Sequence, residues 1–325
     1  MHAPPLRPLL VSIAILSFAS SPARAEDNHA FELKTPTGTL FGTLDAPTGD
    51  PPWPVAIIIA GSGPTDRDGN QANLKNDSLK MLGHALAAHG IAVLRYDKRG
   101  VGESRGAVSR EEDLRFQQYV DDVADWVRLL RHDPRFTRIA IVGHSDGSLI
   151  GMMAAKQVDG VDAFVSLEGA GRPAVDVLRE QFKKNLSTDD FAKSDQILTQ
   201  LSDGKTIDDV PKDLADLRPS VQPYLKSWLN VDPAKEIADL KIPILIVQGT
   251  TDIQVTGEDA HRLAGANKHA RLVEIQNMNH LLKNCLVTWR WVQLINYSDP
   301  TLKLEPKLVE AVVPFLQESL GATKK

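Results

Sequence analysis

The sequence predicts an α/β protein with a doubly wound, mostly parallel sheet and an inserted helical cap. Several short runs are almost wholly apolar, as in strands buried on both faces of a parallel sheet. These runs cover residues 55–60, 91–96, 139–142, 163–167 and 244–247. Helical patterns such as 79–88 and 111–131 separate them. Strands that alternate with helices are typical of this fold class.

The amino terminus has the pattern of a secretory signal peptide. A basic start precedes a short apolar run over 9–19, and Ala23-Arg24-Ala25 then forms an A-x-A site. The run is too short for a bilayer span, which needs about 20 residues; a buried helix is the alternative. We expect 1–25 to be a signal peptide that is cleaved after Ala25, and the mature chain to be periplasmic or secreted.

Composition limits the class of protein further. The single cysteine, Cys285, excludes an internal disulfide and a lipid-anchored cysteine at the cleavage site. The formal net charge is −5 and no basic block occurs, so nucleic acid is not an expected partner. We expect a soluble, exported protein that does not insert into the membrane after cleavage. No oligomeric state is indicated.

The first elements follow in a simple order. A β-hairpin is expected over 31–43, because alternating apolar residues flank a turn at 35–38. The helix over 79–88 should end at Gly90, which suits a helix C-terminus. The helix over 111–131 should end before Pro134.

Residues 172–240 differ from the rest of the chain. They contain many charges and no apolar strand run, but helix-like pieces occur near 175–185, 191–201 and 223–229. An insertion between two strands at the carboxyl edge of the sheet lies where ligands bind. We therefore expect 172–240 to be a helical cap. The α/β core should comprise 26–171 and 241–325.

Gly143-His144-Ser145-Asp146-Gly147 is the most informative motif. It matches G-x-S-x-G, between the apolar run 138–142 and a helical pattern over 148–155. Strand, sharp turn and helix are the context of a nucleophile elbow. The glycines let the strand and the helix approach closely around a strained serine. Ser145 is the predicted nucleophile.

A serine nucleophile needs a base and an oriented acid, which follow it in this order: serine, acid, histidine. Asp252 comes shortly after the strand at 244–247, and His280 follows a strand-like run at 272–275. We predict that His280 is the base and Asp252 the acid. Glu168, at the end of the 163–167 strand, is the alternative acid.

An oxyanion hole should complete the site. One donor is expected to be the backbone N–H of Asp146, the residue after the nucleophile. The other is expected from the glycine-rich loop after the first buried strand, with Ser62 favoured and Gly61 and Gly63 left open.

Two other motifs are better explained without a ligand. Residues 66–70 resemble the start of a calcium loop, but the spacing breaks and the glycine comes too early. Residues 96–104 contain G-x-G without a P-loop lysine. We expect a polar loop at the site entrance and a tight turn, with no metal and no cofactor.

The motifs at 60–70, 95–100 and 143–147, with Val231-Asp232-Pro233-Ala234, resemble the α/β-hydrolase superfamily. The resemblance is to a bacterial carboxylesterase branch related to serine aminopeptidase-like hydrolases. It implies an α/β-hydrolase fold, a catalytic triad at positions matching the three predicted above, and hydrolysis of esters with short to medium acyl chains. One departure is a long segment, 281–298, with Trp289 and Trp291, which is expected to line or obstruct the pocket.

The expected function is therefore that of a serine esterase with a small-molecule ester substrate. A peptidase resembling aminopeptidases, or an acyltransferase, would use the same triad. An aminopeptidase should show acidic cap residues that converge on the pocket to hold a free amino terminus. A catalytically silent binding protein on a hydrolase scaffold is the alternative from another class.

Overall fold

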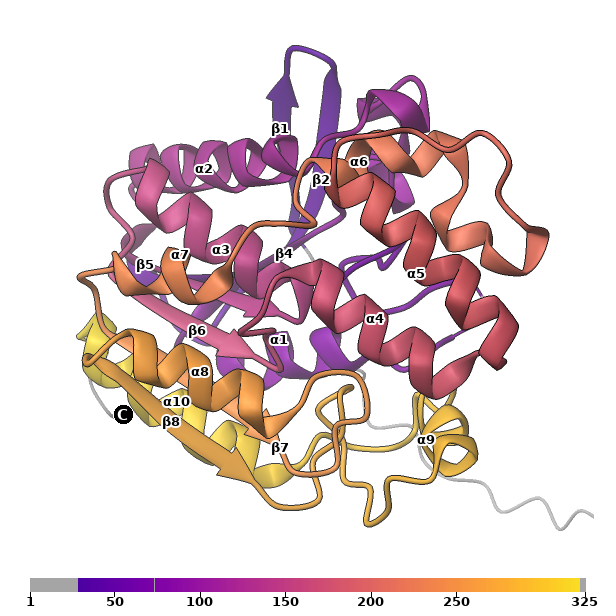
Figure 1. Cartoon of the computed structure of the whole chain (residues 1–325). Helices are drawn as coiled ribbons and strands as arrows, with labels where there is room; N and C mark the ends of the chain where they lie inside the picture. The colour runs from indigo at the N-terminus through magenta and orange to yellow at the C-terminus, as the bar shows by residue number, and fades with distance from the viewer. Residues whose placement is uncertain (1–28, 73, 322–325) are drawn as a thin grey trace, which may run out of the picture.

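The computed structural model describes residues 29–72 and 74–321. The predicted signal peptide, 1–25, and its cleavage site lie outside the described residues. The described chain forms one eight-stranded sheet in the order β1-β2-β4-β3-β5-β6-β7-β8 (Figure 1). The strands are β1 (His29–Thr35), β2 (Gly38–Asp45), β3 (Trp53–Ile59), β4 (Ala92–Tyr96), β5 (Phe136–His144), β6 (Ala163–Leu167), β7 (Ile244–Gly249) and β8 (Ala270–Ile275).

The sheet is mostly parallel, as the sequence predicts. β1 and β2 form the expected antiparallel hairpin, and β2 pairs antiparallel with β4. All neighbours from β4 to β8 pair in parallel. Their carboxyl ends therefore meet at one edge of the sheet, which is where ligands bind in open α/β sheets.

Helices cover both faces of this sheet (Figure 1). The α-helices are α1 (Ser78–Ala88), α2 (Phe116–His132), α3 (Asp146–Gln157), α4 (Ala174–Asn185), α5 (Thr188–Ser202), α6 (Gln222–Lys226), α7 (Pro233–Ala238), α8 (Gly257–Ala266), α9 (Arg290–Asn296) and α10 (Pro306–Leu320). Short 3₁₀ helices are η1 (Gly102–Ala107), η2 (Glu111–Asp113), η3 (Lys212–Leu217) and η4 (Pro219–Val221). In residues 29–72 and 74–321, no helix combines the length and the apolar character that crossing a membrane requires.

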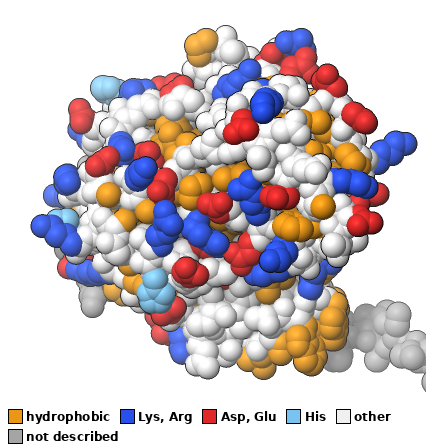
Figure 2. All heavy atoms as spheres, viewed as in Figure 1, with side chains coloured by type: hydrophobic (Ala, Val, Ile, Leu, Met, Phe, Trp, Pro, Cys, Tyr) orange, Lys and Arg blue, Asp and Glu red, His pale blue; other side chains and the backbone are white. Residues whose placement is uncertain are grey.

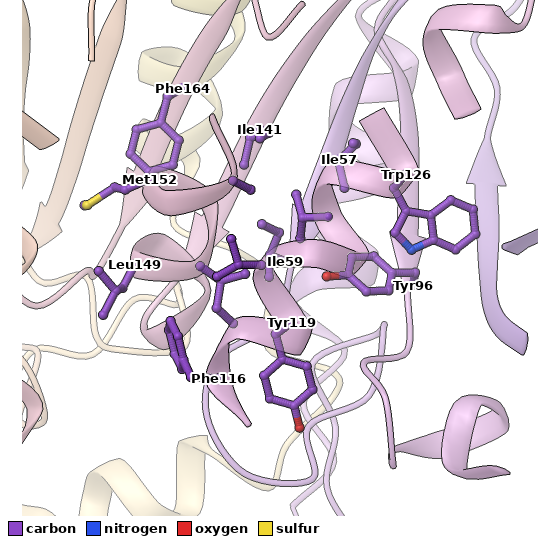
Figure 3. Packing of buried hydrophobic residues seen from close by; sticks show 14 of the residues in the cluster. Ile57, Ile59, Tyr96, Phe116, Tyr119, Trp126, Ile141, Leu149, Met152 and Phe164 are labelled. Atoms are coloured by element: carbon purple, nitrogen blue, oxygen red, sulfur yellow. The ribbon is translucent and has the colours of Figure 1, made fainter. Parts of the chain in front are cut away.

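Alternate residues of the central strand β3 enter different hydrophobic layers. Ile57 and Ile59 pack in a cluster with α2, α3 and α8, where Trp126 is fully buried (Figure 3). Ala56 and Ile58 pack against α1 and α10. A strand with apolar side chains on both faces gives the continuous apolar run seen in the sequence.

Residues 172–240, the segment expected to be a cap, lie between β6 and β7 and form helices only. These helices are α4 to α7 with η3 and η4, and α4 and α5 lie side by side beyond the strand ends (Figure 1). The segment packs on the core through Trp228, whose ring stacks on Phe116 of α2 at 5.1 Å between centroids. Its apolar residues thus extend the core cluster that contains α2.

Candidate active site

The turn between β5 and α3 forces Ser145 into a strained backbone conformation. Ser145 has φ 54° and ψ −121° and directly precedes α3. A Cβ at Gly143 would lie 2.3 Å from the carbonyl oxygen of Gly147, and one at Gly147 would lie 2.4 Å from that of Ile59. Only glycine fits at these two positions, because backbone atoms occupy the space of any side chain. Ser145 is thereby held at the carboxyl edge of the sheet.

His280 and Asp252 lie together beside this turn. Nδ1 of His280 is 2.7 Å from Oδ2 of Asp252. The other carboxylate oxygen of Asp252 accepts the backbone N–H groups of Gln254, at 2.7 Å, and Val255, at 3.1 Å. Burial alone would raise the pKa of Asp252, but His280 and these hydrogen bonds hold it below its usual value. His280 and Ser145 line the same pocket, so the structure brings all three predicted residues to one place.

Glu168, the alternative acid, lies behind Asp252. Its side chain is fully buried and accepts the Gly249 N–H at 2.8 Å and the amide of Gln248 at 2.5 Å. Burial raises the pKa of Glu168 well above its usual value, and the neighbouring Asp252 carboxylate raises it further. The raised pKa favours the protonated form of Glu168, which can share a hydrogen with Asp252, while His280 bonds to Asp252 itself.

The predicted oxyanion residues surround Ser145. Asp146 is the first residue of α3, and Ser62 lies in the loop that follows β3. Ser62 and Ser145 line the same pockets. A Cβ at Gly61 would lie 3.1 Å from Cβ of Ser145, so the glycine loop runs directly against the serine.

His144 has a structural role that the sequence did not indicate. Its Nε2 is 2.7 Å from the carbonyl oxygen of His280, to which it donates its hydrogen. Burial lowers the pKa of His144 to about 3, so the ring stays neutral. This contact joins the serine turn to the histidine loop. It spans the ends of β5 and β8, which are not neighbours in the sheet, and so left no local signal in the sequence.

Two pockets meet at Ser145. The first, the polar pocket, lies on the side of His280 and the glycine loop, and it is lined by Gly61, Ser62, Thr65, Gly69, Gln71, Leu74, Asn76, Ser78, His144, Ser145, Gln254, His280, Leu281 and Tyr297. The second, the apolar pocket, lies under α4 and is lined by Ser62, Ser145, Asp146, Leu149, Ala170, Arg172, Ala174, Val177, Leu178, Gln181, Trp228, Pro233, Gln254 and Val255. Ser145 therefore faces both pockets.

The loop at 66–70 borders the polar pocket through Gly69. Asp66 accepts the backbone N–H groups of Asp68, at 2.9 Å, and Asn70, at 2.8 Å, so its carboxylate is used within its own loop. Among the described residues, no cluster of three or more His, Cys, Asp or Glu side chains is arranged to hold a metal ion.

The turn after β4 is held by buried polar contacts. Asp97 accepts the backbone N–H groups of Arg67, at 2.8 Å, and Glu103, at 2.9 Å. Arg99 donates to Asp122 of α2. The G-x-G at 100–102 thus belongs to a packed turn, as expected.

The segment 281–298 differs in part from its prediction. Leu281 and Tyr297 line the polar pocket, but Trp289 and Trp291 do not. The two tryptophans are 62% and 63% exposed and stack on each other at 6.1 Å. They belong to a hydrophobic patch on and beside α9 that also contains Leu286, Leu294 and Ile295 (Figure 2). Within α9 the buried position is taken by Gln293, which donates to the backbone carbonyls of Thr251 and Val287.

Comparison with known proteins agrees with this architecture. The family model described as serine aminopeptidase, S33, matches residues 76–198. Esterase EstD of Thermotoga maritima is 27% identical over 261 residues, which is 79% of this chain and 61% of the relative. The chain thus spans less than two thirds of that relative's length.

Solved structures of similar fold cover nearly all of the chain. Est1E of Butyrivibrio proteoclasticus, in a complex with ferulic acid, has a TM-score of 0.61 and 20% identity, with 90% of this chain and 100% of that chain covered. Esterase Pf2001 of Pyrococcus furiosus has a TM-score of 0.60 and 18% identity, with 91% and 93% covered. With the strand order and the serine turn, these matches show that the chain has the α/β-hydrolase fold.

Proposed function

We propose that this protein is a serine hydrolase that cleaves carboxylic esters with short to medium acyl chains through an acyl-enzyme. One observation carries the proposal. His280 bonds to the buried Asp252 at 2.7 Å and shares a pocket with Ser145, which is held on a strained turn. A serine becomes nucleophilic when an oriented histidine accepts its proton, and this arrangement supplies that histidine.

In the proposed mechanism, Ser145 Oγ attacks the acyl carbon while Nε2 of His280 takes its proton. Asp252 holds the Nδ1–H and stabilises the positive ring that forms. The oxygen that becomes negative accepts the backbone N–H groups of Ser62 and Asp146. The ester C–O bond then breaks, and the alcohol leaves with the proton from His280. Water activated by His280 releases the acid and restores Ser145.

The lining of the apolar pocket favours an ester over an aminopeptidase substrate. The pocket residues from 172–240 are Arg172, Ala174, Val177, Leu178, Gln181, Trp228 and Pro233. No Asp or Glu occurs among them, although an aminopeptidase would need acidic groups there to hold a free amino terminus. The acidic lining residue is Asp146 of the serine turn, which accepts the Tyr224 hydroxyl at 3.2 Å. We therefore assign the acyl chain to the apolar pocket.

The similar proteins support the same class of reaction. Their names describe esterases, EstD of Thermotoga maritima and Pf2001 of Pyrococcus furiosus, and the Est1E structure contains ferulic acid. We carry over only the reaction class.

We also propose that the protein is exported, since 1–25 has the signal-peptide pattern. The mature protein would begin at Glu26. Mass spectrometry of protein recovered from the cell envelope fraction of an expression host identifies its first residue. An intact amino terminus found only in the cytosol would contradict it.

The test of the function is a panel of p-nitrophenyl esters of rising chain length beside aminoacyl anilides. We expect ester turnover that Ser145→Ala lowers by about 10⁴-fold or more, since the triad acts as a unit. Anilide turnover that exceeds ester turnover would favour the peptidase, and transfer to an added alcohol in preference to water would favour the acyltransferase. Equal rates of ester turnover by the wild type and by Ser145→Ala would indicate a binding protein without catalytic activity.

A further inference from the structure

Lys98 is a buried lysine that the proposed triad does not explain. It is 1% exposed, and its ammonium group donates to the carbonyl oxygen of Gly61. The ring of Tyr119 lies 5.2 Å from the same nitrogen. Burial lowers the pKa of Lys98 to about 8, although Asp146 nearby opposes this. Since burying an ammonium group costs free energy, a buried lysine in this place calls for a specific use.

The sheet register places this lysine next to the serine turn. β3 pairs in parallel with β4 on one side and with β5 on the other. Continued past the strand ends, the two registers put Lys98 and Ser145 on opposite sides of Gly61. The contacts agree: Gly61 accepts from Lys98, and a Cβ on Gly61 would lie 3.1 Å from Cβ of Ser145.

Because Lys98 holds the Gly61 carbonyl, the peptide bond between Gly61 and Ser62 determines the direction of the Ser62 N–H. It is trans, since the cis bond among the described residues joins Pro51 to Pro52. In a trans peptide, the C=O and the N–H point in opposite directions. If Lys98 fixes the Gly61 carbonyl on its own side, the Ser62 N–H points to the side of Ser145.

This peptide needs a hold because the residue before it is a glycine and a second glycine follows Ser62. Gly61 has no side chain to restrict it, and Gly63 has φ 69°. A rotation of the peptide would turn the Ser62 N–H away from Ser145 and point the Gly61 carbonyl oxygen toward it. A carbonyl dipole there would repel a negatively charged oxygen.

We infer that Lys98 is a positioning residue, which holds the Gly61 carbonyl so that the Ser62 N–H faces the oxyanion formed during ester cleavage. The inference rests on the proposed function, because an oxyanion forms only if Ser145 attacks a carbonyl carbon. Lys98 itself does not touch the substrate. It acts through one peptide group.

The test is Lys98→Met, which keeps the length of the side chain and removes the donor. Removal of one oxyanion donor lowers kcat by about 10²–10³-fold. We expect Lys98→Met to lower kcat by about 10²-fold, because it misaligns the Ser62 N–H without removing it. KM for p-nitrophenyl butyrate should change by less than about threefold. Titration of the serine with a fluorophosphonate counts the folded enzyme, so that partial misfolding does not imitate the effect. If Lys98→Met does not fold, Lys98→Gln, whose amide is too short to reach, replaces it.

A second readout separates orientation from stability. A trifluoromethyl ketone forms a tetrahedral adduct with an active serine and places an oxygen where the oxyanion forms. Its affinity should fall by the same factor as kcat/KM. Asp122→Asn is the matched control, because Asp122 pairs with Arg99 beside Lys98 and contacts neither Gly61 nor Ser62. It should lower the melting temperature and leave kcat unchanged.

A double variant tests whether Lys98 acts through the Gly61–Ser62 peptide. Ser62→Pro removes the N–H at the other end of the same peptide, so adding Lys98→Met to it should cost little more. Full additivity would overturn the inference, as would unchanged ketone affinity in Lys98→Met. Wild-type protein without Ser145-dependent ester hydrolysis would overturn the proposed function and the inference together. Normal hydrolysis by both wild type and Lys98→Met would overturn the inference alone.

Discussion

The sheet edge and the helical segment at 172–240 contribute differently to the site. At the edge, the side chains of Asp252, Glu168 and His144 are buried and fixed by hydrogen bonds to backbone groups. The helical segment supplies mainly apolar surface, including Val177 and Leu178 of α4. Under the proposed function, we expect the edge to determine the rate for every ester and the helices to determine which acyl chain fits.

The two regions are nevertheless joined at fixed points. Arg172, at the start of the helical segment, donates to both carboxylate oxygens of Asp259 in α8, at 2.9 and 2.8 Å. The backbone N–H of Gly171 donates to the same carboxylate. Because Asp259 is fully buried, this ion pair anchors the segment where it leaves the sheet.

The largest expected effect is at the sheet edge. Asp252→Asn should lower kcat/KM by about 10⁴-fold for all esters, because the His280 ring would lose its orientation and charge partner. Glu168→Gln should cost less than about tenfold, since a glutamine amide can still donate to Asp252. Steady-state kinetics with the ester panel measures both. The reverse ranking would show that Glu168 is the acid.

A smaller and selective effect is expected in the helical segment. Leu178→Trp should fill part of the apolar pocket and lower kcat/KM for octanoate esters by about 10-fold or more, with acetate nearly unchanged. Lys183→Trp adds the same side chain to an exposed position of the same helix and should change neither. An equal loss for acetate and octanoate in Leu178→Trp would refute the separation of rate from acyl selection.

The last expected effect concerns stability at the edge rather than activity, and it depends on pH. An unfolded histidine binds a proton near pH 6.5, but buried His144 does so only near pH 3. The folded state thus binds fewer protons between these values, and the free energy of unfolding should fall by up to about 1.4 kcal/mol per pH unit as the pH decreases. His144→Gln lacks this titration and should show a shallower fall. Urea unfolding at pH 7, 6, 5 and 4 measures the two slopes; identical slopes would contradict the prediction.

The strands and the serine turn were predictable because their signals are local. β3, β6 and β7 are covered on both faces and give continuous apolar runs. The helix expected from residue 111 begins only at Phe116, after the 3₁₀ turn η2, because the Gln118 side chain caps the Arg115 N–H there. Chain order likewise sufficed to bring Ser145, Asp252 and His280 together.

Contacts between distant strand ends were not predictable. Lys98 and His144 obtain their roles from the register of β3 with β4 and from the approach of β5 to the loop after β8. Both residues lie within motifs seen in the sequence, 95–100 and 143–147, but those motifs do not indicate these contacts. The outward position of Trp289 was missed because exposed aromatic residues look like core residues when only spacing is read.

Three of the five tryptophans, Trp228, Trp289 and Trp291, offer two separate optical signals. Trp228 lines the apolar pocket, whereas Trp289 and Trp291 are exposed on α9, near the polar pocket lined by Tyr297. Water-exposed indoles emit at longer wavelengths than shielded ones and are more open to iodide quenching. Fluorescence can therefore follow acyl-chain binding and events at the opposite rim independently, without an attached label.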